Sequence, residues 1–484
     1  MKDIPPKVLK TFERIKKSEE GCIELKKIKG RYYVYRATSE WDKEDKKVRK
    51  ITVYLGSITP EGMYVPKKQR VQESKREVFE YANGMLAYRL LDVVGEKLKE
   101  YTPHHRELIA AAIIKALDPK PLRLISSRWE KLYLQKVIDV NLSPKNISKI
   151  LRDTGKGVGW WYDFFEELSG NDLLLYDLTS VFTHSKNIRM AEKGYNNERK
   201  YCDQLGVVIA FSVEDMLPTG IEVYWGSMKD ITTIKDFLER FGNRKRNRSR
   251  KGKGKGKRSM GFILDRGFWS EKLIRDFRRE GINYVVPLRK NSELMDTRWL
   301  RWRKPFTYGQ RTIKWSRKKT ELGQLYFFYD PQLRGEEETA LLRKVEQGVM
   351  TMEEFEERKK VAGVIGLLSN LERSGEDMFD LYKGREDVEI AFDAMKNSLD
   401  ADSIMHTDEA VRGYFFVTLL ALRIYFSVLK RLRERELTNK VSVEEVFFEL
   451  SKVQKIVEPN REYFARIPKR ARRIMELFPE LPMG

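Results

Sequence analysis

Residues 173–178 read LLLYDL, an apolar run that carries one acid, Asp177. Residues 260–265 read MGFILD, a second apolar run that ends on an acid, Asp265. Short apolar runs of this kind are typical of buried strands. Acids are rare in buried strands unless they are paired or bind a metal, although a single Asp at a strand end is more often a turn or capping residue. The two runs therefore predict a buried sheet and mark two candidate site residues.

Further strand and helix patterns surround these two runs. Three closely spaced strands predict a meander, and two later strands separated by helices predict parallel pairing in an α/β mixed sheet. Besides the two runs, the patterns predict strands at 205–213, 221–225 and 282–288, and helices at 231–241 and 270–279.

A third acid lies on a helix predicted over residues 377–399. At about 100° per residue, a stripe about 60° wide beside the apolar face carries a set of polar residues. Its members are Tyr382, Arg385, Glu389 and Lys396. Glu389 is then at the edge of the core, where it can face the strand ends. The alternative is an exposed Arg385–Glu389 ion pair worth about 0.2–0.5 kcal/mol, and the pattern alone leaves both open.

Three carboxylates from two strands and a following helix match the needs of metal-dependent phosphoryl transfer. Mg²⁺ prefers hard oxygen ligands, and two ions about 3.5–4 Å apart can activate a nucleophile and stabilise a leaving oxygen. Arg385 and Lys396 would then lie beside a phosphodiester and neutralise its charge. Tyr382 could stack on a base or bond a phosphate.

The charge of the chain favours a polyanionic partner. The 484 residues carry a formal net charge of 94 − 72 = +22, which fits nucleic acid or, failing that, an anionic membrane surface. Residues 243–258 hold ten Lys/Arg and no acid, which predicts a mobile loop that either contacts the DNA backbone or is a solvated insertion. The basic residues expected to contact DNA there are Arg244, Lys245, Arg246, Arg248, Arg250 and Lys251.

Several protein classes are disfavoured. Two cysteines and four histidines argue against a disulfide framework, a zinc site and a Cys-His nucleophile. The longest apolar stretch, residues 414–422, is too short to span a bilayer, and the N-terminus lacks the apolar run of a signal peptide. We therefore expect an intracellular protein without a membrane partner.

At the helix of the third acid the chain resembles a known family. The pattern Tyr382-x2-Arg385-x3-Glu389-x6-Lys396 is similar to the Y-R-E-K signature of one branch of the DDE insertion-sequence transposases. Four residues at three fixed spacings make this a fairly specific match. The resemblance implies that Tyr382, Arg385 and Lys396 contact the DNA at the transposon end.

The resemblance covers most of the chain and is strongest over 172–425. It implies a ribonuclease H-like core with a β-rich insertion, in which Asp177, Asp265 and Glu389 are catalytic and hold metal. Two Mg²⁺ ions are expected, with Mn²⁺ able to substitute. The implied partners are double-stranded DNA, both terminal inverted repeats and target, and a second subunit in a synaptic homodimer. The implied location is the nucleoid-associated cytoplasm of a prokaryote.

The segments expected from these patterns begin with a small β hairpin and a helical region. Within the latter, Ser143 starts one helix, Gly155 ends it and 158–168 forms another; a helix-turn-helix is possible, but two ordinary packed helices are the simpler interpretation. The expected segments are a β-rich region 1–70, a helical DNA-end-binding domain 71–168, the first part of the core 169–290, an inserted subdomain 291–360, the second part of the core with the catalytic helix 361–455, and a tail 456–484.

The sequence thus predicts a DNA transposase that binds insertion-sequence ends and performs metal-dependent cleavage and strand transfer by a DDE mechanism. Three alternatives remain open at this point. They are a metal-dependent nuclease of the same fold, a non-catalytic (domesticated) DNA-binding protein, and an RNA-binding protein whose aromatic residues stack on bases.

Overall fold

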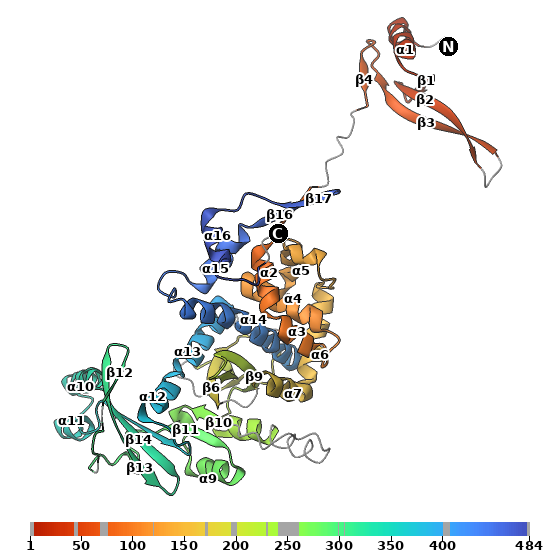
Figure 1. Ribbon diagram of the computed structural model, residues 1–484. Coiled ribbons are helices and arrows are strands. Elements are labelled where there is room, and N and C mark those ends of the chain that lie inside the picture. The colour runs from red at the N-terminus through yellow and green to blue at the C-terminus, as the bar shows by residue number, and fades with distance from the viewer. Residues whose placement is uncertain are drawn as a thin grey trace. The chain divides into compact units, whose positions relative to one another are not determined.

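The chain forms two compact units. Unit 1 comprises Met1–Glu77 with Glu458–Arg461, and unit 2 comprises Val78–Val457 with Glu462–Gly484. A computed structural model (Figure 1) describes residues 4–42, 47–67, 76–119, 121–169, 173–194, 201–228, 231–240, 261–298, 300–303, 305–399 and 407–481. Within these ranges no helix is long and apolar enough to cross a membrane.

Unit 1 is a helix packed on one face of a four-stranded antiparallel sheet. The apolar residues of the helix recur at i and i+7, and Val8 and Ile15 bury against Ile23, Val34 and Ile58 of the sheet. The sheet order is β1-β2-β3-β4. The elements are α1 (Pro6–Ser18), β1 (Cys22–Ile28), β2 (Arg31–Asp42), β3 (Lys47–Ile58) and β4 (Tyr64–Pro66).

Unit 2 is built on a large mixed sheet. Over the described residues its order is β12-β13-β14-β15-β11-β10-β6-β8-β7, with β9 paired to β8. The strands are β6 (Leu173–Phe182), β7 (Glu192–Lys193), β8 (Asp203–Ser212), β9 (Leu217–Trp225), β10 (Gly261–Leu264), β11 (Asn283–Pro287), β12 (Phe306–Tyr308), β13 (Arg311–Thr320), β14 (Gly323–Tyr329) and β15 (Val364–Ser369).

The strand pairing at the centre of this sheet agrees with the sequence patterns. Strands β6, β8 and β9 are antiparallel neighbours, as a meander requires. Strand β10 is parallel to β6, and β11 is parallel to β10. Strand β15 then pairs antiparallel to β11, which makes the sheet mixed.

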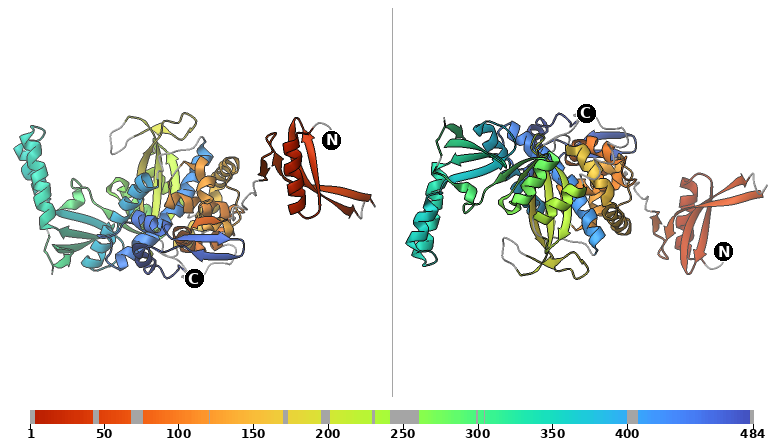
Figure 2. Two further views of the ribbon diagram at one scale, coloured as in Figure 1. Left: turned by 90° about the horizontal axis from the view of Figure 1, so that it is seen from above. Right: turned by 90° about the horizontal axis from the view of Figure 1, so that it is seen from below.

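The segment expected as an inserted, partly β subdomain, residues 291–360, contributes strands to the same sheet. Strand β14 pairs with β15 from Gln324 to Tyr329, and β13 pairs with β14. The predicted β content is present, but its hydrogen bonds run into the core sheet. The sequence pattern could not show this pairing because β14 and β15 are distant along the chain. Two helices, α10 (Pro331–Glu346) and α11 (Met352–Lys359), project from this end of unit 2 (Figure 2).

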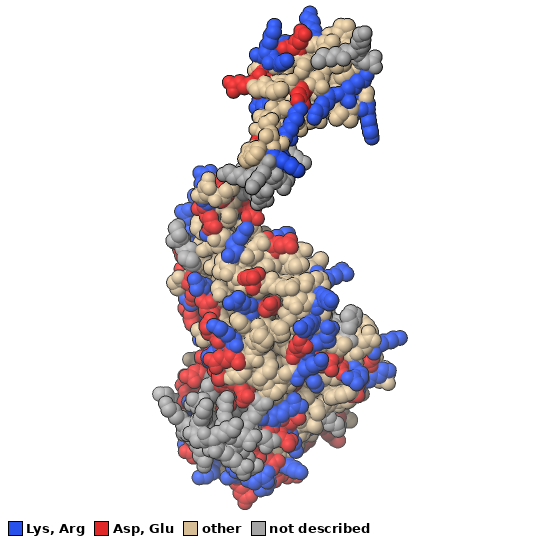
Figure 3. Space-filling model, turned by 90° about the vertical axis from the view of Figure 1, so that its right-hand side faces the viewer, with Lys and Arg blue, Asp and Glu red and all other residues tan. Residues whose placement is uncertain are grey.

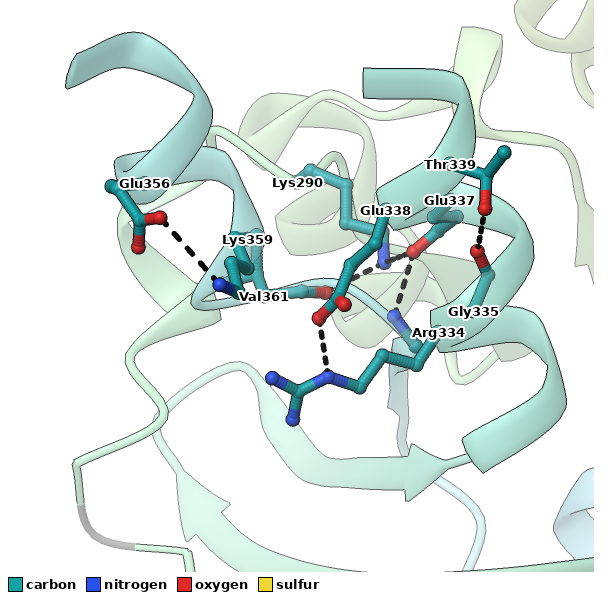
Figure 4. Close-up of polar contacts among 10 residues, drawn as sticks. Lys290, Arg334, Gly335, Glu337, Glu338, Thr339, Glu356, Lys359 and Val361 are labelled. Carbon is teal, nitrogen blue, oxygen red and sulfur yellow. Dashed lines mark hydrogen bonds and ion pairs between the residues drawn. The ribbon is translucent and has the colours of Figure 1, made fainter. Parts of the chain in front are cut away.

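One lysine ties the projecting helices to the core sheet. Lys290 follows β11, and its Nζ donates to Glu337 on α10 at 3.0 Å (Figure 4). The same ammonium donates to the carbonyl oxygens of Val361 at 2.8 Å and Val364 at 2.7 Å. Glu337 also accepts the backbone N–H of Gly363 at 2.7 Å. The three protons of the ammonium therefore each have an acceptor.

A long buried helix, α14 (Asp408–Glu434), lies between the sheet and the preceding helices (Figure 1). Helix α7 buries Trp161, Phe164 and Phe165 in the shared core, and all three contact Phe416 of α14. The preceding helical elements are α2 (Ala82–Leu90), α3 (Asp92–Leu98), α4 (His105–Leu117), η1 (Leu122–Leu124), α5 (Ile125–Trp129), η2 (Tyr133–Lys136), α6 (Pro144–Lys156) and α7 (Val158–Ser169). Helices α6 and α7 are therefore packed parts of the core.

The prediction that Gly155 ends its helix was wrong. Helix α6 runs through Gly155 to Lys156. A Cβ on Gly155 would lie 1.7 Å from the carbonyl oxygen of Glu409, and one on Gly413 would lie 2.0 Å from that of Leu151. The two glycines are needed because the backbones of α6 and α14 approach each other too closely for any side chain.

The chain closes with a small sheet and two helices beside α2. The three-stranded sheet has the order β17-β16-β5. The elements are β5 (Glu77–Glu80), α15 (Val443–Ser451), β16 (Gln454–Glu458), β17 (Arg461–Phe464) and α16 (Lys469–Met475).

Candidate active site

Asp177 and Asp265 lie side by side on adjacent parallel strands. The register pairs Tyr176 of β6 with Leu264 of β10, so the next residue on each strand is an aspartate. Strand β10 is fully buried over its four residues, and Asp265 follows it with 35% of its side chain exposed. Asp177 is half-buried, and its Oδ1 accepts the backbone N–H of Leu178 at 2.9 Å. The register thus places two carboxylates next to each other at the point where β10 ends, and both are partly exposed.

Arg385 connects this pair to the third acid. Its Nη1 donates to Oδ1 of Asp265 at 2.5 Å, and its Nη2 donates to Oε1 of Glu389 at 3.3 Å. The Arg385 side chain is 18% exposed, whereas that of Glu389 is 63% exposed. The two distances make the Asp265 contact the stronger one and leave Glu389 loosely held.

The charge of Asp177 also affects the pKa of Arg385. Burial by itself lowers the pKa of the guanidinium, but the negative charges of Asp265, Asp177 and Glu389, with the phenol of Tyr382, raise it above its ordinary value. The half-buried guanidinium therefore bonds to Asp265 and Glu389 and is also influenced by the charge of Asp177.

Arg385 also keeps a free donor. Among the described residues, its Nε is a buried N–H with no hydrogen-bond acceptor. A buried donor without a partner is costly, so such an atom marks a place where an acceptor is expected to bind.

The predicted continuous helix over 377–399 was wrong. The segment consists of α12 (Gly375–Lys383), α13 (Glu386–Asp393) and one turn of π-helix, η5 (Ala394–Ser398). In that turn the N–H of Leu399 bonds to the carbonyl oxygen of Ala394, five residues back. A stripe counted at about 100° per residue does not hold across such a break. Single π-turns inside helices are frequent at functional sites.

The other two signature residues lie on either side of α13. The Cζ of Arg385 is 5.9 Å from the ring centroid of the half-buried Tyr382 on α12. Lys396 lies on η5, is half-buried, and makes no hydrogen bond or ion pair with the described residues. The basic residues Arg244, Lys245, Arg246, Arg248, Arg250 and Lys251 lie outside the described residues.

The described side chains around Arg385 do not form a complete metal-binding site. Within the described ranges, no three His, Cys, Asp or Glu side chains are close enough to hold one metal ion. The guanidinium lies between Asp265 and Glu389 and neutralises both. The donor set itself, three carboxylates at a partly open edge, suits a hard cation such as Mg²⁺.

The buried ionisable residues that the sequence analysis missed include Lys115 and Glu222. Lys115, 5% exposed on α4, donates to the carbonyl oxygen of Leu399 and to the hydroxyl of Tyr414, both at 2.6 Å. Glu222, 1% exposed on β9, accepts the hydroxyl of Tyr162 at 2.7 Å. The signal for each was a single charge inside an apolar run, IAAAIIKAL and GIEVYW.

Comparison with known proteins gives the class of this chain. Residues 169–424, more than half of the 484, match the transposase DDE domain. The chain belongs to the transposase DDE domain family. No curated protein matches its sequence. A similar solved structure is a piggyBac transposase synaptic complex with hairpin DNA, determined by cryo-EM. The two share 11% identity with a TM-score of 0.35, over 77% of this chain and 80% of the other.

Proposed function

We propose that this protein is a DNA transposase that binds the ends of an insertion sequence and catalyses metal-dependent strand cleavage and strand transfer, with Asp177, Asp265 and Glu389 as the acidic triad. The observation that carries the proposal is the grouping of these acids around Arg385, two by strand register and one through the guanidinium. The family membership supports the same reaction class.

The proposed catalytic core is ribonuclease H-like and belongs to the Y-R-E-K branch. The ribonuclease H-like assignment is supported by the order of elements: a three-stranded meander, then two parallel strands, then the helix that carries the third acid. The spacing of Tyr382, Arg385, Glu389 and Lys396 supports the Y-R-E-K branch.

The three carboxylates are proposed to hold Mg²⁺, two ions in the full complex, with Mn²⁺ able to substitute. Glu389 is exposed and only loosely held at 3.3 Å, so it can leave Arg385 for a cation without unfolding anything. Bound there, the metal would activate a water or a DNA 3′-hydroxyl and stabilise the leaving oxygen.

The remaining residues would position the DNA. Arg385 has an unused Nε donor, which a phosphate oxygen would satisfy. Lys396 has no acidic partner among the described residues and can neutralise a neighbouring phosphate. Tyr382 packs on the guanidinium and limits its movement. The proposed DNA partners are terminal inverted repeats and target duplex, held in a synaptic homodimer.

The proposal is tested by a cleavage-and-joining assay on the DNA that flanks the gene, with Mg²⁺ or Mn²⁺ and the full chain. Asp177→Asn, Asp265→Asn and Glu389→Gln are each expected to abolish both steps. Glu386→Gln is the matched control, because Glu386 lies on the same helix, is 59% exposed and pairs with Lys383 instead. Cleavage without joining would reveal a nuclease, and DNA binding without chemistry would reveal a non-catalytic protein.

A further inference from the structure

The excess positive charge of the chain is concentrated in two places. Residues 1–77 contain 21 Lys/Arg and 12 Asp/Glu, a net charge of 21 − 12 = +9. Residues 243–258 add +10, so the remaining chain carries only 22 − 9 − 10 = +3. Figure 3 shows basic side chains spread over the visible face of unit 1, with fewer acids between them. Any polyanion is therefore attracted to unit 1 as well as to the basic segment.

Among the described residues of unit 1, a helix covers only one face of the sheet. Helix α1 packs on that face, through Val8 and Ile15. On the uncovered side, three tyrosines from two strands form a cluster. The ring of Tyr54 is 6.0 Å from that of Tyr33 and 5.5 Å from that of Tyr35. We call this side the open face.

The open face continues along the β2–β3 ribbon beyond the end of β1. Strand β1 pairs with β2 only as far as Ala37. Farther out, Trp41 is directly opposite Val48, and alternation along the strands puts this pair on the same side as Tyr35. Trp41 is 58% exposed and Val48 is 63% exposed. A two-stranded ribbon with exposed apolar pairs gains stability when a partner covers it.

Two lysines add positive charge to the open face. The Nζ of Lys26 lies 4.9 Å from the ring centroid of Tyr35. Lys50 reaches across β2 to an ion pair with Glu24, and its side chain remains 56% exposed. Apart from Glu24, the aromatic and basic side chains give this side the mixed character of a nucleic-acid surface.

We propose that the open face binds duplex DNA, with the β2–β3 ribbon in the major groove. This rests on the proposed function, because it names the surface that recognises the DNA. Two strands about 4.8 Å apart fit a major groove about 12 Å wide, where apolar side chains contact thymine methyl groups and lysines contact phosphates. A second copy of the same unit is disfavoured as the occupant, because two units of net charge +9 repel each other.

The test measures binding of the full chain to a fluorescein-labelled duplex of the gene's flanking DNA over a salt series. Lys50→Glu is expected to weaken binding and to reduce the log–log salt slope by about 1. Arg49→Glu is the matched control: it is the next residue, makes the same charge change, and lies on the opposite side of the ribbon. Its slope is expected to stay within error of wild type.

A second pair of variants tests the apolar part of the open face. Trp41→Ala is expected to weaken duplex binding by about tenfold. Ile51→Ala is its control, since Ile51 is 41% exposed and faces the other side of the ribbon. All four side chains are exposed, so folding is retained, which circular dichroism verifies.

The results separate this proposal from the catalytic one. Equal effects of Lys50→Glu and Arg49→Glu, or stronger binding to single-stranded than to duplex DNA, would overturn the docking proposal. Unchanged duplex binding by Trp41→Ala together with a loss of self-association would make the open face a protein interface. If Lys50→Glu weakens binding while the wild type cleaves nothing, the docking surface stands and the catalytic proposal falls.

Discussion

The ammonium of Lys115 is bonded to the carbonyl oxygen of Leu399, 2.6 Å away on the residue that directly follows η5. The same group bonds to Tyr414 and lies 4.1 Å from the centroid of its ring. A buried charge from α4 therefore fixes the end of the segment that carries Glu389 and Lys396. Lys115 is a positioning residue, because it acts on the site through this segment.

Lys115→Met is expected to destabilise the protein by about 1–3 kcal/mol, because a buried carbonyl and a buried hydroxyl lose their donor. Hydrogen exchange should speed up over α13 and η5. Lys97→Met is the control: Lys97 also donates to a backbone carbonyl, that of Glu167, but at an exposed position. Urea unfolding should show less than about 0.5 kcal/mol for the control. Equal losses for both variants would contradict the role of Lys115.

Gly413→Ala is expected to force α6 and α14 apart. The added methyl group would lie 2.0 Å from the carbonyl oxygen of Leu151, and the cost of such overpacking is about 1–3 kcal/mol or more. Gly335→Ala provides the comparison, because Gly335 lies within α10 with nothing inside 4 Å of its added Cβ. That change should stabilise the protein by about 0.5–1 kcal/mol. Thermal melts of both variants decide the matter.

Arg385→Gln is expected to separate metal binding from catalysis. Removing the cation leaves Asp265 and Glu389 unneutralised, so Mn²⁺ should bind several-fold more tightly without DNA, as electron paramagnetic resonance measures. DNA cleavage should fall by about 10²–10³, because a phosphate-binding group is lost. Lys383→Gln, which removes the pair with Glu386 and the contact with the ring of Tyr308 but leaves Arg385 in place, should change neither. Unaltered Mn²⁺ binding in Arg385→Gln would show that the guanidinium does not compete with the metal.

Glu222→Gln is expected to stabilise the protein increasingly as the pH rises. Burial raises the pKa of the Glu222 carboxyl above its ordinary value, against the lowering effects of Tyr162 and Arg240. A raised carboxyl pKa contributes stability below the unfolded-state value of 4.5, and this is lost as the pH rises through the folded-state value. The amide avoids that loss, so the gap should widen by at most about 1.4 kcal/mol per pH unit.

Urea unfolding at about pH 5 and about pH 8 measures this gap. Glu239→Gln, the same change at an exposed acid on the neighbouring helix over 231–240, is the matched control and should alter the unfolding free energy by less than about 0.5 kcal/mol. A variant that is less stable than wild type by the same amount at both pH values would show that Glu222 stays charged in its network.

The placement of two acids was predictable because it depends on local pattern. Apolar runs identify buried strands, and the parallel register of β6 and β10 puts Asp177, which lies within β6, beside Asp265, which follows β10. The meander and the parallel pairs follow from spacing alone. The grouping with Glu389 was also anticipated, but by a wrong route, since the stripe assumed an unbroken α-helix.

Features that depend on distant contacts were not predictable. This segment packs on β6 and α14, and we attribute the break between α12 and α13 and the π-turn η5 to that packing. The local sequence contains no pattern that predicts the hydrogen bond from Leu399 to Ala394, five residues back. Gly155 resembled a helix stop because glycine is a weak helix former, while its actual role is set by α14, more than 250 residues away. Lys115 and its acceptor Leu399 are separated by 284 residues.

The continuity of the large sheet links the projecting helices to the candidate active site. Helix α10 is joined by Lys290 to the segment after β11 and to β15, and strand pairing runs without interruption from β14 through β15 and β11 to β10, which Asp265 follows. The projecting helix pair is thus connected through paired strands to β10, the strand that Asp265 follows. The helix pair and Asp265 therefore belong to one hydrogen-bonded frame.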